Sequence, residues 1–321
     1  MKSEQDFLDL IDTHFTFGHE LLRLGRGDDC AVLAGGRDIC VSSDLFLEDV
    51  HFRRDYFTAE DIGHKALAVN ISDIAAMGAR PFAFTMDLMV PPGLDEEFWN
   101  GFFQGMATLA RHTDMALAGG DLSRADRLGV SISIFGVGGS KGRFLTRGNC
   151  APGDILFTVG ELGLARVGLL TLEALGRQAR EEFPTAALAH LRPKPKVMIG
   201  TLLNAAGVKG LMDVSDGLAR DLPRFLGPNL GADLTLRGEM LNGNVVAYAL
   251  AMGLDPVELT VLGGEDYALL GCVSEEEFPK AASVPGFTEI GRVTEAQGIR
   301  INGTPFSTPG FDHFENPQSH P

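Results

Sequence analysis

The chain has 321 residues and a mass of 34.4 kDa, which predicts about two domains. Hydrophobic residues make up 45% and charged residues 22%, which excludes a disordered or disulfide-dependent chain. The formal charge of −16 disfavours nucleic acid and anionic membranes as partners, and phosphate ligands would need accompanying cations. The sequence has no apolar run that could span a bilayer, no signal peptide and no CxxC pair, so we expect a cytoplasmic protein.

Strands and helices are predicted to alternate along the first part of the chain. Residues 38–47 are rich in β-branched and apolar residues and predict a strand. Thr58 and Asp61 have the spacing of a capping box that begins a long helix, and Gly78 is a natural stop for it. A strand over 81–90, a helix from about 95 to 112 and a strand over 128–137 follow.

A glycine-rich, basic stretch at residues 136–153 interrupts the apolar periodicity and predicts a domain boundary. Beyond it, the strand-like segment DILFTVG begins a second series of strands and helices. We therefore expect a mixed α/β fold of two domains, over residues 1–140 and 150–321.

Carboxylates recur beside glycine or short hydroxyl residues, mostly where predicted strands end. Asp73 is the exception, because it lies with Asn70 on a helix that is otherwise almost wholly apolar. Each such motif alone is explained at least as well by a helix cap or an Asx-turn, but six together favour a shared site. The motifs occupy residues 27–29, 42–44, 70–73, 119–121, 213–217 and 263–266.

Converging carboxylates without matching Lys or Arg repel one another unless a cation lies between them. Oxygen ligands with few histidines favour Mg²⁺ bound to a polyphosphate and disfavour zinc. The usual phosphate loops are missing, because residues 136–142 (GVGGSKG) fit neither the Walker register nor GxGxxG. If the protein binds ATP, it does so through another architecture.

A string of motifs in a fixed order resembles the thiamine-monophosphate kinase family. The motifs are GDDCAVL, SSDLFLEDVHF, KALAVNISDIAAMGARP, LAGGD, LTRGNCAPGD, MDVSDGL, GGEDY and GFDHF, and they extend from about Gly27 to Phe314. This family is part of the aminoimidazole-ribonucleotide-synthetase-like ATP-binding superfamily. The resemblance implies a two-domain synthetase-like fold whose N-terminal mixed sheets pair in a homodimer, with several Mg²⁺ ions in a cleft between the domains.

The resemblance also implies transfer of the ATP γ-phosphoryl group to thiamine monophosphate, and it assigns roles to residues. The catalytic set is Asp44, Asp73, Asp121 and Arg147. The metal ligands are Asp28, Ser42, Ser43, Asp44, Asp73, Asp121, Asp213 and Asp216. The nucleotide contacts are Phe103, Gly120, Asp121, Arg147 and Ser215, and the thiamine-phosphate contacts are His51, Glu265 and Phe311.

Several of these residues have plainer explanations when they are taken singly. A lone His51 is more often structural, Phe103 fits core packing in its amphipathic helix, and Phe311 could staple the C-terminus. Two other functions stay open at this point: another ATP-dependent synthetase or dehydratase of the same superfamily, and a non-catalytic nucleotide–Mg²⁺ regulator.

Overall fold

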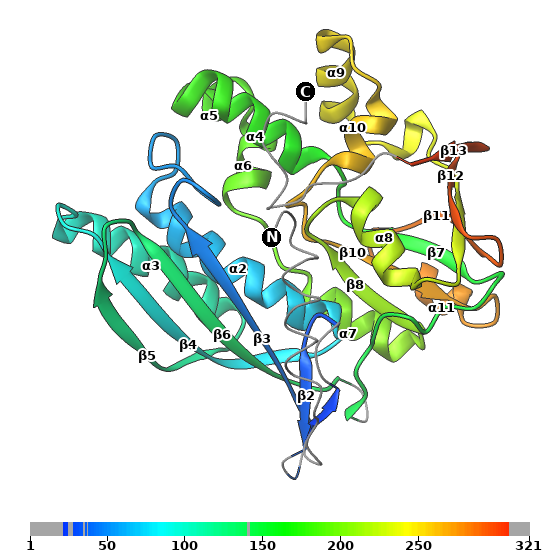
Figure 1. The fold of residues 1–321 in the computed structure, drawn as a ribbon, viewed down its shortest axis with the longest axis horizontal. Helices are drawn as coiled ribbons and strands as arrows, with labels where there is room; N and C mark the ends of the chain where they lie inside the picture. The colour runs from blue at the N-terminus through cyan, green and yellow to red at the C-terminus, as the bar shows by residue number, and fades with distance from the viewer. Residues whose placement is uncertain (1–21, 25–27, 35, 37, 140–141, 308–321) are drawn as a thin grey trace.

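The computed structural model describes residues 22–24, 28–34, 36, 38–139 and 142–307, and this part of the chain forms two sheets with helices (Figure 1). The first sheet has six strands, which are antiparallel except where β4 and β5 pair in parallel. In spatial order they are β1 (Leu22–Leu24), β2 (Ala31–Ala34), β3 (Asp38–Leu47), β6 (Gly129–Val137), β4 (Arg80–Val90) and β5 (Ala116–Arg124).

The second sheet has seven strands and is built from the C-terminal half of the chain. Its pairs are antiparallel except β9 with β12. In spatial order the strands are β13 (Thr304–Phe306), β12 (Gly298–Ile301), β9 (Gly231–Leu234), β11 (Phe287–Thr294), β7 (Ile155–Val159), β10 (Ala268–Val273) and β8 (Gly210–Val214). The mixed α/β fold with two sheets confirms the predicted fold class.

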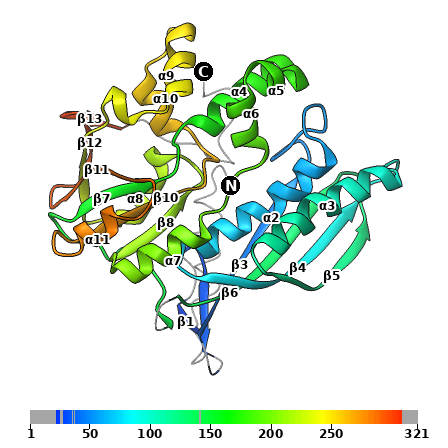
Figure 2. The same ribbon diagram turned by 180° about the vertical axis from the view of Figure 1, so that it is seen from behind.

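Helix α2 (Ala59–Ala76) lies between the first sheet and the C-terminal half, and α3 (Glu96–His112) packs beside it (Figure 2). The predicted start of α2 is confirmed by its capping box. Thr58 Oγ1 accepts the Asp61 N–H at 3.2 Å, and Asp61 Oδ2 accepts the Thr58 N–H at 2.9 Å. Nearly the whole surface of α2 is buried, as expected for a helix that is covered on both sides.

The other helices of the described residues belong to the C-terminal half. They are α4 (Leu164–Leu175), α5 (Ala179–Glu182), α6 (Pro184–Leu191), α7 (Val197–Ala206), α8 (Leu218–Leu226), α9 (Gly243–Met252), α10 (Pro256–Leu262) and α11 (Phe278–Ala282), with short 3-10 turns at Gly176–Gln178 and Gly238–Met240. Within the described part of the chain, no single helix combines the length and apolar composition needed to cross a membrane; α9 and α10, bent by 117°, do so only as a pair.

The two halves share a hydrophobic core at the C-terminal end of α2. Ala75 and Ala76 pack with Leu203 of α7 and Leu211 of β8 in one buried cluster. Close approach is possible because Gly200 faces the Ala75 carbonyl, where a Cβ would be only 2.2 Å from the oxygen. The end of α2 is therefore held in a fixed position relative to both sheets.

Two of the carboxylate motifs lie inside strands. Asp44 lies within β3, and Gly120 and Asp121 lie within β5. Gly120 is required there by packing, because a Cβ would meet the Met86 carbonyl oxygen at 1.8 Å. Glycine therefore marks a close strand contact at this position rather than a turn.

The close contact between α2 and α3 depends on Gly105. Replacing this glycine should therefore lower the stability of the protein. A Cβ on Gly105 would lie 2.0 Å from the Glu60 carbonyl oxygen, so Gly105→Ala must push the helices apart. We expect it to lower the free energy of unfolding by about 1–3 kcal/mol in chemical denaturation, despite the better helix propensity of alanine. Gly243→Ala, where nothing lies within 4 Å, is the control and should not destabilise. Equal stabilities for the two variants would contradict the close contact.

Candidate functional site

Strand β3 presents two polar side chains to α2. Side chains alternate along a strand, so Ser42 and Asp44 share the face that also carries the buried Cys40 and Phe46. The Ser42 hydroxyl donates a hydrogen bond to Asp73 Oδ2 on α2. The sequence thus brings the Ser42, Asp44 and Asp73 side chains to one interface between sheet and helix.

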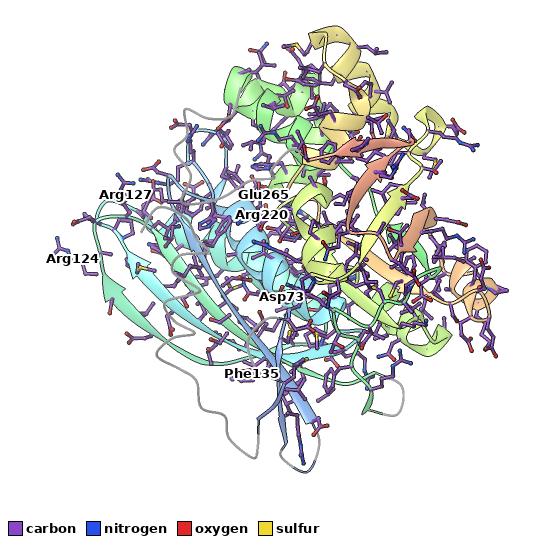
Figure 3. The ribbon with its side chains drawn as sticks, turned by 45° about the vertical axis from the view of Figure 1, so that its right-hand side comes forward. Asp73, Arg124, Arg127, Phe135, Arg220 and Glu265 are labelled. Atoms are coloured by element: carbon purple, nitrogen blue, oxygen red, sulfur yellow. The ribbon has the colours of Figure 1, made fainter. Side chains whose placement is uncertain are left out.

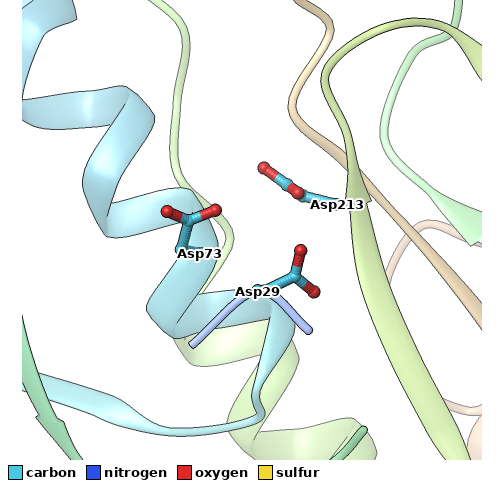
Figure 4. A group of neighbouring side chains, drawn as sticks. All are labelled: Asp29, Asp73 and Asp213. Carbon is cyan, nitrogen blue, oxygen red and sulfur yellow. The ribbon is translucent and has the colours of Figure 1, made fainter. Parts of the chain in front are cut away.

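Three carboxylates from distant parts of the chain meet beside this interface (Figure 4). Asp29 comes from the segment before β2, Asp73 from α2 and Asp213 from β8 of the second sheet. One oxygen of each lies within 4.8 Å of the others. We call Asp29, Asp73 and Asp213 the carboxylate triad; it joins the two halves of the chain.

Neighbouring groups fix the orientation of the triad. The Ser72 hydroxyl donates to Asp213 Oδ2 at 2.6 Å. The Arg147 guanidinium forms an ion pair with Asp29, and the Arg147 backbone N–H donates to Asp28 Oδ2 at 2.9 Å. Arg147 therefore holds Asp28 beside the carboxylate triad, whereas Asp29 is itself a member of the triad.

Burial makes the carboxylate triad electrostatically unfavourable in the absence of a cation. It raises the pKa of Asp29 and of Asp73 well above the usual value, and for Asp73 the charges of Asp44 and Asp213 add to the effect. Burial and the Asp213 charge raise the pKa of Asp44 to about 6. Because these acids bind protons more tightly when folded, ionising Asp44 lowers the stability as the pH rises from 3.8 through about 6.

A divalent cation fits this arrangement. Asp29 Oδ2 is buried and has no hydrogen-bond partner in the described structure, so an oxygen is left to coordinate an ion. The donor set consists of carboxylate and hydroxyl oxygens, which suit Mg²⁺ rather than zinc. The residues that could hold Mg²⁺ are Asp29, Ser42, Asp44, Asp73 and Asp213.

Two other predicted metal ligands of the N-terminal half point away from the triad. Ser43 lies on the opposite face of β3, where it accepts a hydrogen bond from Ser133 at 3.1 Å. Asp121 pairs in register with Asp87 on that same outer face, and the sheet separates it from Asp73. Gly120 lies beside Asp121 in the edge strand.

The loop after β8 carries the predicted residues of the second half. Asp221 of α8 accepts the backbone N–H groups of Ser215 and Asp216 at 3.0 and 2.9 Å, which fixes the loop next to Asp213. The Asp216 carboxylate accepts a hydrogen bond from Arg224 at 2.7 Å. Ser215 and Asp216 therefore lie next to the triad, and Asp216 already has a cationic partner.

Predicted contacts to nucleotide and thiamine lie at separate places. Phe103 is 43% exposed on α3, with its ring centroid 6.0 Å from that of Trp99. His51 accepts the Leu47 N–H at Nδ1, 2.9 Å away, and therefore carries its proton on Nε2 when neutral. Phe311 lies outside the described residues.

Glu265 lies against the same helix as Asp73, nearer the N-terminus of α2 (Figure 3). Its carboxylate pairs with Lys65 of α2 at 3.1 Å and with His190 of α6 at 3.0 Å. Sequence reasoning missed Lys65, His190, Ser72 and the role of Asp29. The patterns did not indicate His190, whereas Lys65 could have been noticed as the one lysine of α2, next to its apolar stretch.

Comparison with known proteins identifies the family. Residues 27–139 match the family model of AIR synthase related protein, N-terminal domain, and residues 151–303 match that of its C-terminal domain. The chain is 34% identical to the thiamine-monophosphate kinase of Bacillus subtilis (strain 168), over 97% of this chain and 100% of that protein. The chain belongs to the thiamine-monophosphate kinase family. The enzyme of that name from Aquifex aeolicus (strain VF5) is 32% identical over 90% of this chain and 92% of its own length.

Solved structures of thiamine-monophosphate kinases share the fold. AaThiL complexed with AMPPCP and TMP has a TM-score of 0.85 and 28% identity, covering 97% of each chain. Thiamine-monophosphate kinase from Stenotrophomonas maltophilia K279a has a TM-score of 0.73 and 30% identity, covering 94% of this chain and 98% of its own. The hydrogenase maturation protein HypE of E. coli has a TM-score of 0.69 at 21% identity, covering 97% of this chain and all of its own, and shares the fold alone.

Repulsion within the carboxylate triad should lower the melting temperature of the protein when no metal is bound. Asp73→Asn removes one of three repelling charges, so without metal we expect the melting temperature to rise by about 2–4 °C, the shift given by ~1 kcal/mol. The same variant should lose the further rise that Mg²⁺ gives to the wild type. Melting in EDTA and in Mg²⁺ tests both, with the exposed Asp126→Asn as control. A variant that melts below the wild type in EDTA and still responds to Mg²⁺ would refute this account.

Proposed function

We propose that this chain is an ATP-dependent phosphotransferase that converts thiamine monophosphate and ATP into thiamine diphosphate and ADP. The observation that carries the proposal is the carboxylate triad, which gathers Asp29, Asp73 and Asp213 from both halves of a thiamine-monophosphate kinase fold. A related structure is complexed with AMPPCP and TMP, which supports a site for a nucleotide and a second phosphate compound in this fold.

The reaction needs positioning and charge neutralisation more than proton transfer. A phosphate oxygen of thiamine monophosphate attacks the γ-phosphorus in line, and the bond to the β–γ bridging oxygen breaks, so ADP leaves with the electron pair. The attacking oxygen is already ionised near neutral pH, so the chain needs no general base. Mg²⁺ held by the triad, Ser42 and Asp44 would neutralise the repulsion between donor and acceptor phosphates.

The chain's own residues prepare this site. Arg147 holds Asp28 and Asp29 in place, and its guanidinium, 21% exposed, is suited to a phosphate by its planar donors. The Ser215 backbone N–H, bound to Asp221, fixes its loop next to Asp213, and Ser215 stays a predicted nucleotide contact. His51 and Glu265 are the proposed contacts for thiamine monophosphate, and Asp28, Ser43, Asp121 and Asp216 stay predicted metal ligands.

An activity assay tests the function directly. We expect ADP formation only when ATP, Mg²⁺ and thiamine monophosphate are all present. Asp44→Asn should reduce turnover by about 100-fold or more, the usual effect of removing one charge-stabilising group, while circular dichroism stays unchanged. Asp126→Asn, on the exposed surface, is the matched control. A wild type that is inactive under saturating conditions would end the proposal, and activity of Asp44→Asn within a few-fold would end the metal assignment.

We further propose a homodimer formed through the outer face of the first sheet. This face exposes Leu45 (56%) and Phe82 (40%), with Phe135 next to Phe82 at 6.4 Å between ring centroids. Apolar side chains on the uncovered face of a sheet are typical of an interface between subunits. Asp121 lies on the same face of the sheet, so the proposed dimer interface would bury it.

Light scattering after gel filtration tests the dimer. We expect a mass of twice 34.4 kDa for the wild type. Leu45→Glu places a charge on the proposed interface and should shift the mass towards the monomer. Leu250→Glu, on the exposed surface of α9, is the control and should not change the mass. A monomeric wild type at micromolar concentration would exclude this dimer.

A further inference from the structure

Behind the Glu265 carboxylate lie two buried cationic or donor groups. Lys65 Nζ is 3.1 Å from Glu265 Oε1, and His190 Nδ1 is 3.0 Å from Glu265 Oε2. The Lys65 and His190 side chains are 0% and 2% exposed, whereas that of Glu265 is 29% exposed. Both partners therefore hold the carboxylate from the inside, and only Glu265 faces outward.

Aromatic packing fixes the two inner partners. The Lys65 ammonium lies 5.5 Å from the centroid of the Phe57 ring, within the range of a cation–π interaction. The His190 ring meets the same Phe57 ring edge-on, with centroids 5.7 Å apart. Since Lys65 comes from α2 and His190 from α6, Phe57 joins the two groups into one rigid support.

The backbone of Glu265 is fixed independently. Its N–H donates to the Ser215 carbonyl at 2.7 Å, and Asp266 accepts the N–H groups of Gly163 and Ala165 at 2.6 and 3.0 Å. Glu265 has φ of 62°, a left-handed conformation that non-glycine residues rarely adopt. Such backbone strain persists where the surroundings enforce it and clusters at functional sites. The loop thus fixes the backbone of Glu265 to the second half, and its side chain reaches the first.

We infer that Lys65 and His190 are positioning residues, which hold the Glu265 carboxylate in one orientation for contact with the thiamine moiety. This inference rests on the proposed function, which assigns Glu265 to thiamine monophosphate. It adds two residues that do not themselves contact the substrate but determine how tightly it binds.

Electrostatics explains why both partners are needed. The nearby Lys65 and His190 hold the pKa of Glu265 well below its usual value despite its burial, so the carboxylate stays ionised. Burial and the Lys65 charge lower the pKa of His190, which favours the neutral ring beside the Glu265 carboxylate. Without Lys65, the carboxylate would either take up a proton or turn towards water, and its outward oxygen would no longer be an acceptor in a fixed place.

A purely structural role does not account for this arrangement. A buried ion pair is often no more stabilising than apolar residues of similar volume. If stability were its purpose, the carboxylate would be enclosed as fully as Lys65, yet Glu265 keeps 29% of its side chain exposed. The partially open carboxylate is what a ligand-contacting group with buried support requires.

Steady-state kinetics separates the substrates. Lys65→Met keeps the length of the side chain but removes its charge. We expect the KM for thiamine monophosphate to rise about tenfold or more, the loss of one hydrogen bond to a charged group, while kcat and the KM for ATP change less than threefold. Lys280→Met, which breaks the exposed ion pair of Lys280 with Glu277, is the matched control and should change none of them.

A double-mutant cycle with Glu265→Gln distinguishes positioning from support of the fold. If Lys65 acts through Glu265, Lys65→Met should raise the KM for thiamine monophosphate less than twofold in the Glu265→Gln background. An independent structural effect would raise it by the same factor in both backgrounds, and that result would overturn the inference. The cycle also serves if Lys65→Met folds poorly, since Glu265→Gln removes the buried unpaired charge.

Substitutions at His190 give a second readout. His190→Asn retains an N–H donor near the position of Nδ1 and should keep the KM within threefold, whereas His190→Leu should raise it about tenfold. Equal KM values for the two variants would overturn the role of His190. A wild type without activity towards thiamine monophosphate would defeat the proposed function itself, whereas an active wild type with an unchanged KM in Lys65→Met would defeat only this inference.

Discussion

Repulsion between carboxylates that come from different parts of the chain is the constraint on which this structure depends. Asp29, Asp73 and Asp213 lie within 4.8 Å of one another, and Arg147 pairs directly with only the first of them. Their raised pKa values express the energy needed to keep these charges together. Packing elsewhere in the fold must offset this unfavourable energy. A bound cation can reduce the repulsion between the carboxylates.

Packing offsets this energy through the way α2 is enclosed. The helix carries Asp73 between two sheets, and small residues on its surface let the neighbouring elements approach closely. Gly63 meets the backbone of α3, where a Cβ would be 1.9 Å from the Phe102 oxygen, and Ala75 meets Gly200 of α7. Because these contacts involve backbone atoms on both sides, α2 has little freedom to move its carboxylate away from the others.

The sequence allowed the mixed α/β fold, the limits of α2 and the main acidic residues to be predicted, because each follows from local periodicity or capping. It did not distinguish Asp28 from Asp29, since two adjacent acids in a loop have no periodicity that tells which one points inward. Alternation along β3 could have excluded Ser43 from the face of Ser42. The position of Asp121 depends on strand pairing, which is not a local property.

Two ionic groups along α2 show opposite solutions to the burial of charge. At Glu265 the chain provides a balancing charge, since Lys65 and His190 lie 3.1 and 3.0 Å from the two carboxylate oxygens. At the carboxylate triad the compensation is incomplete, and a buried oxygen of Asp29 lacks a partner among the described residues. A compensated carboxylate can act as a fixed hydrogen-bond acceptor, whereas an uncompensated cluster attracts cations. The same helix therefore carries one ionic group that is balanced from within the chain and one that is not, and the neighbouring residues set this difference.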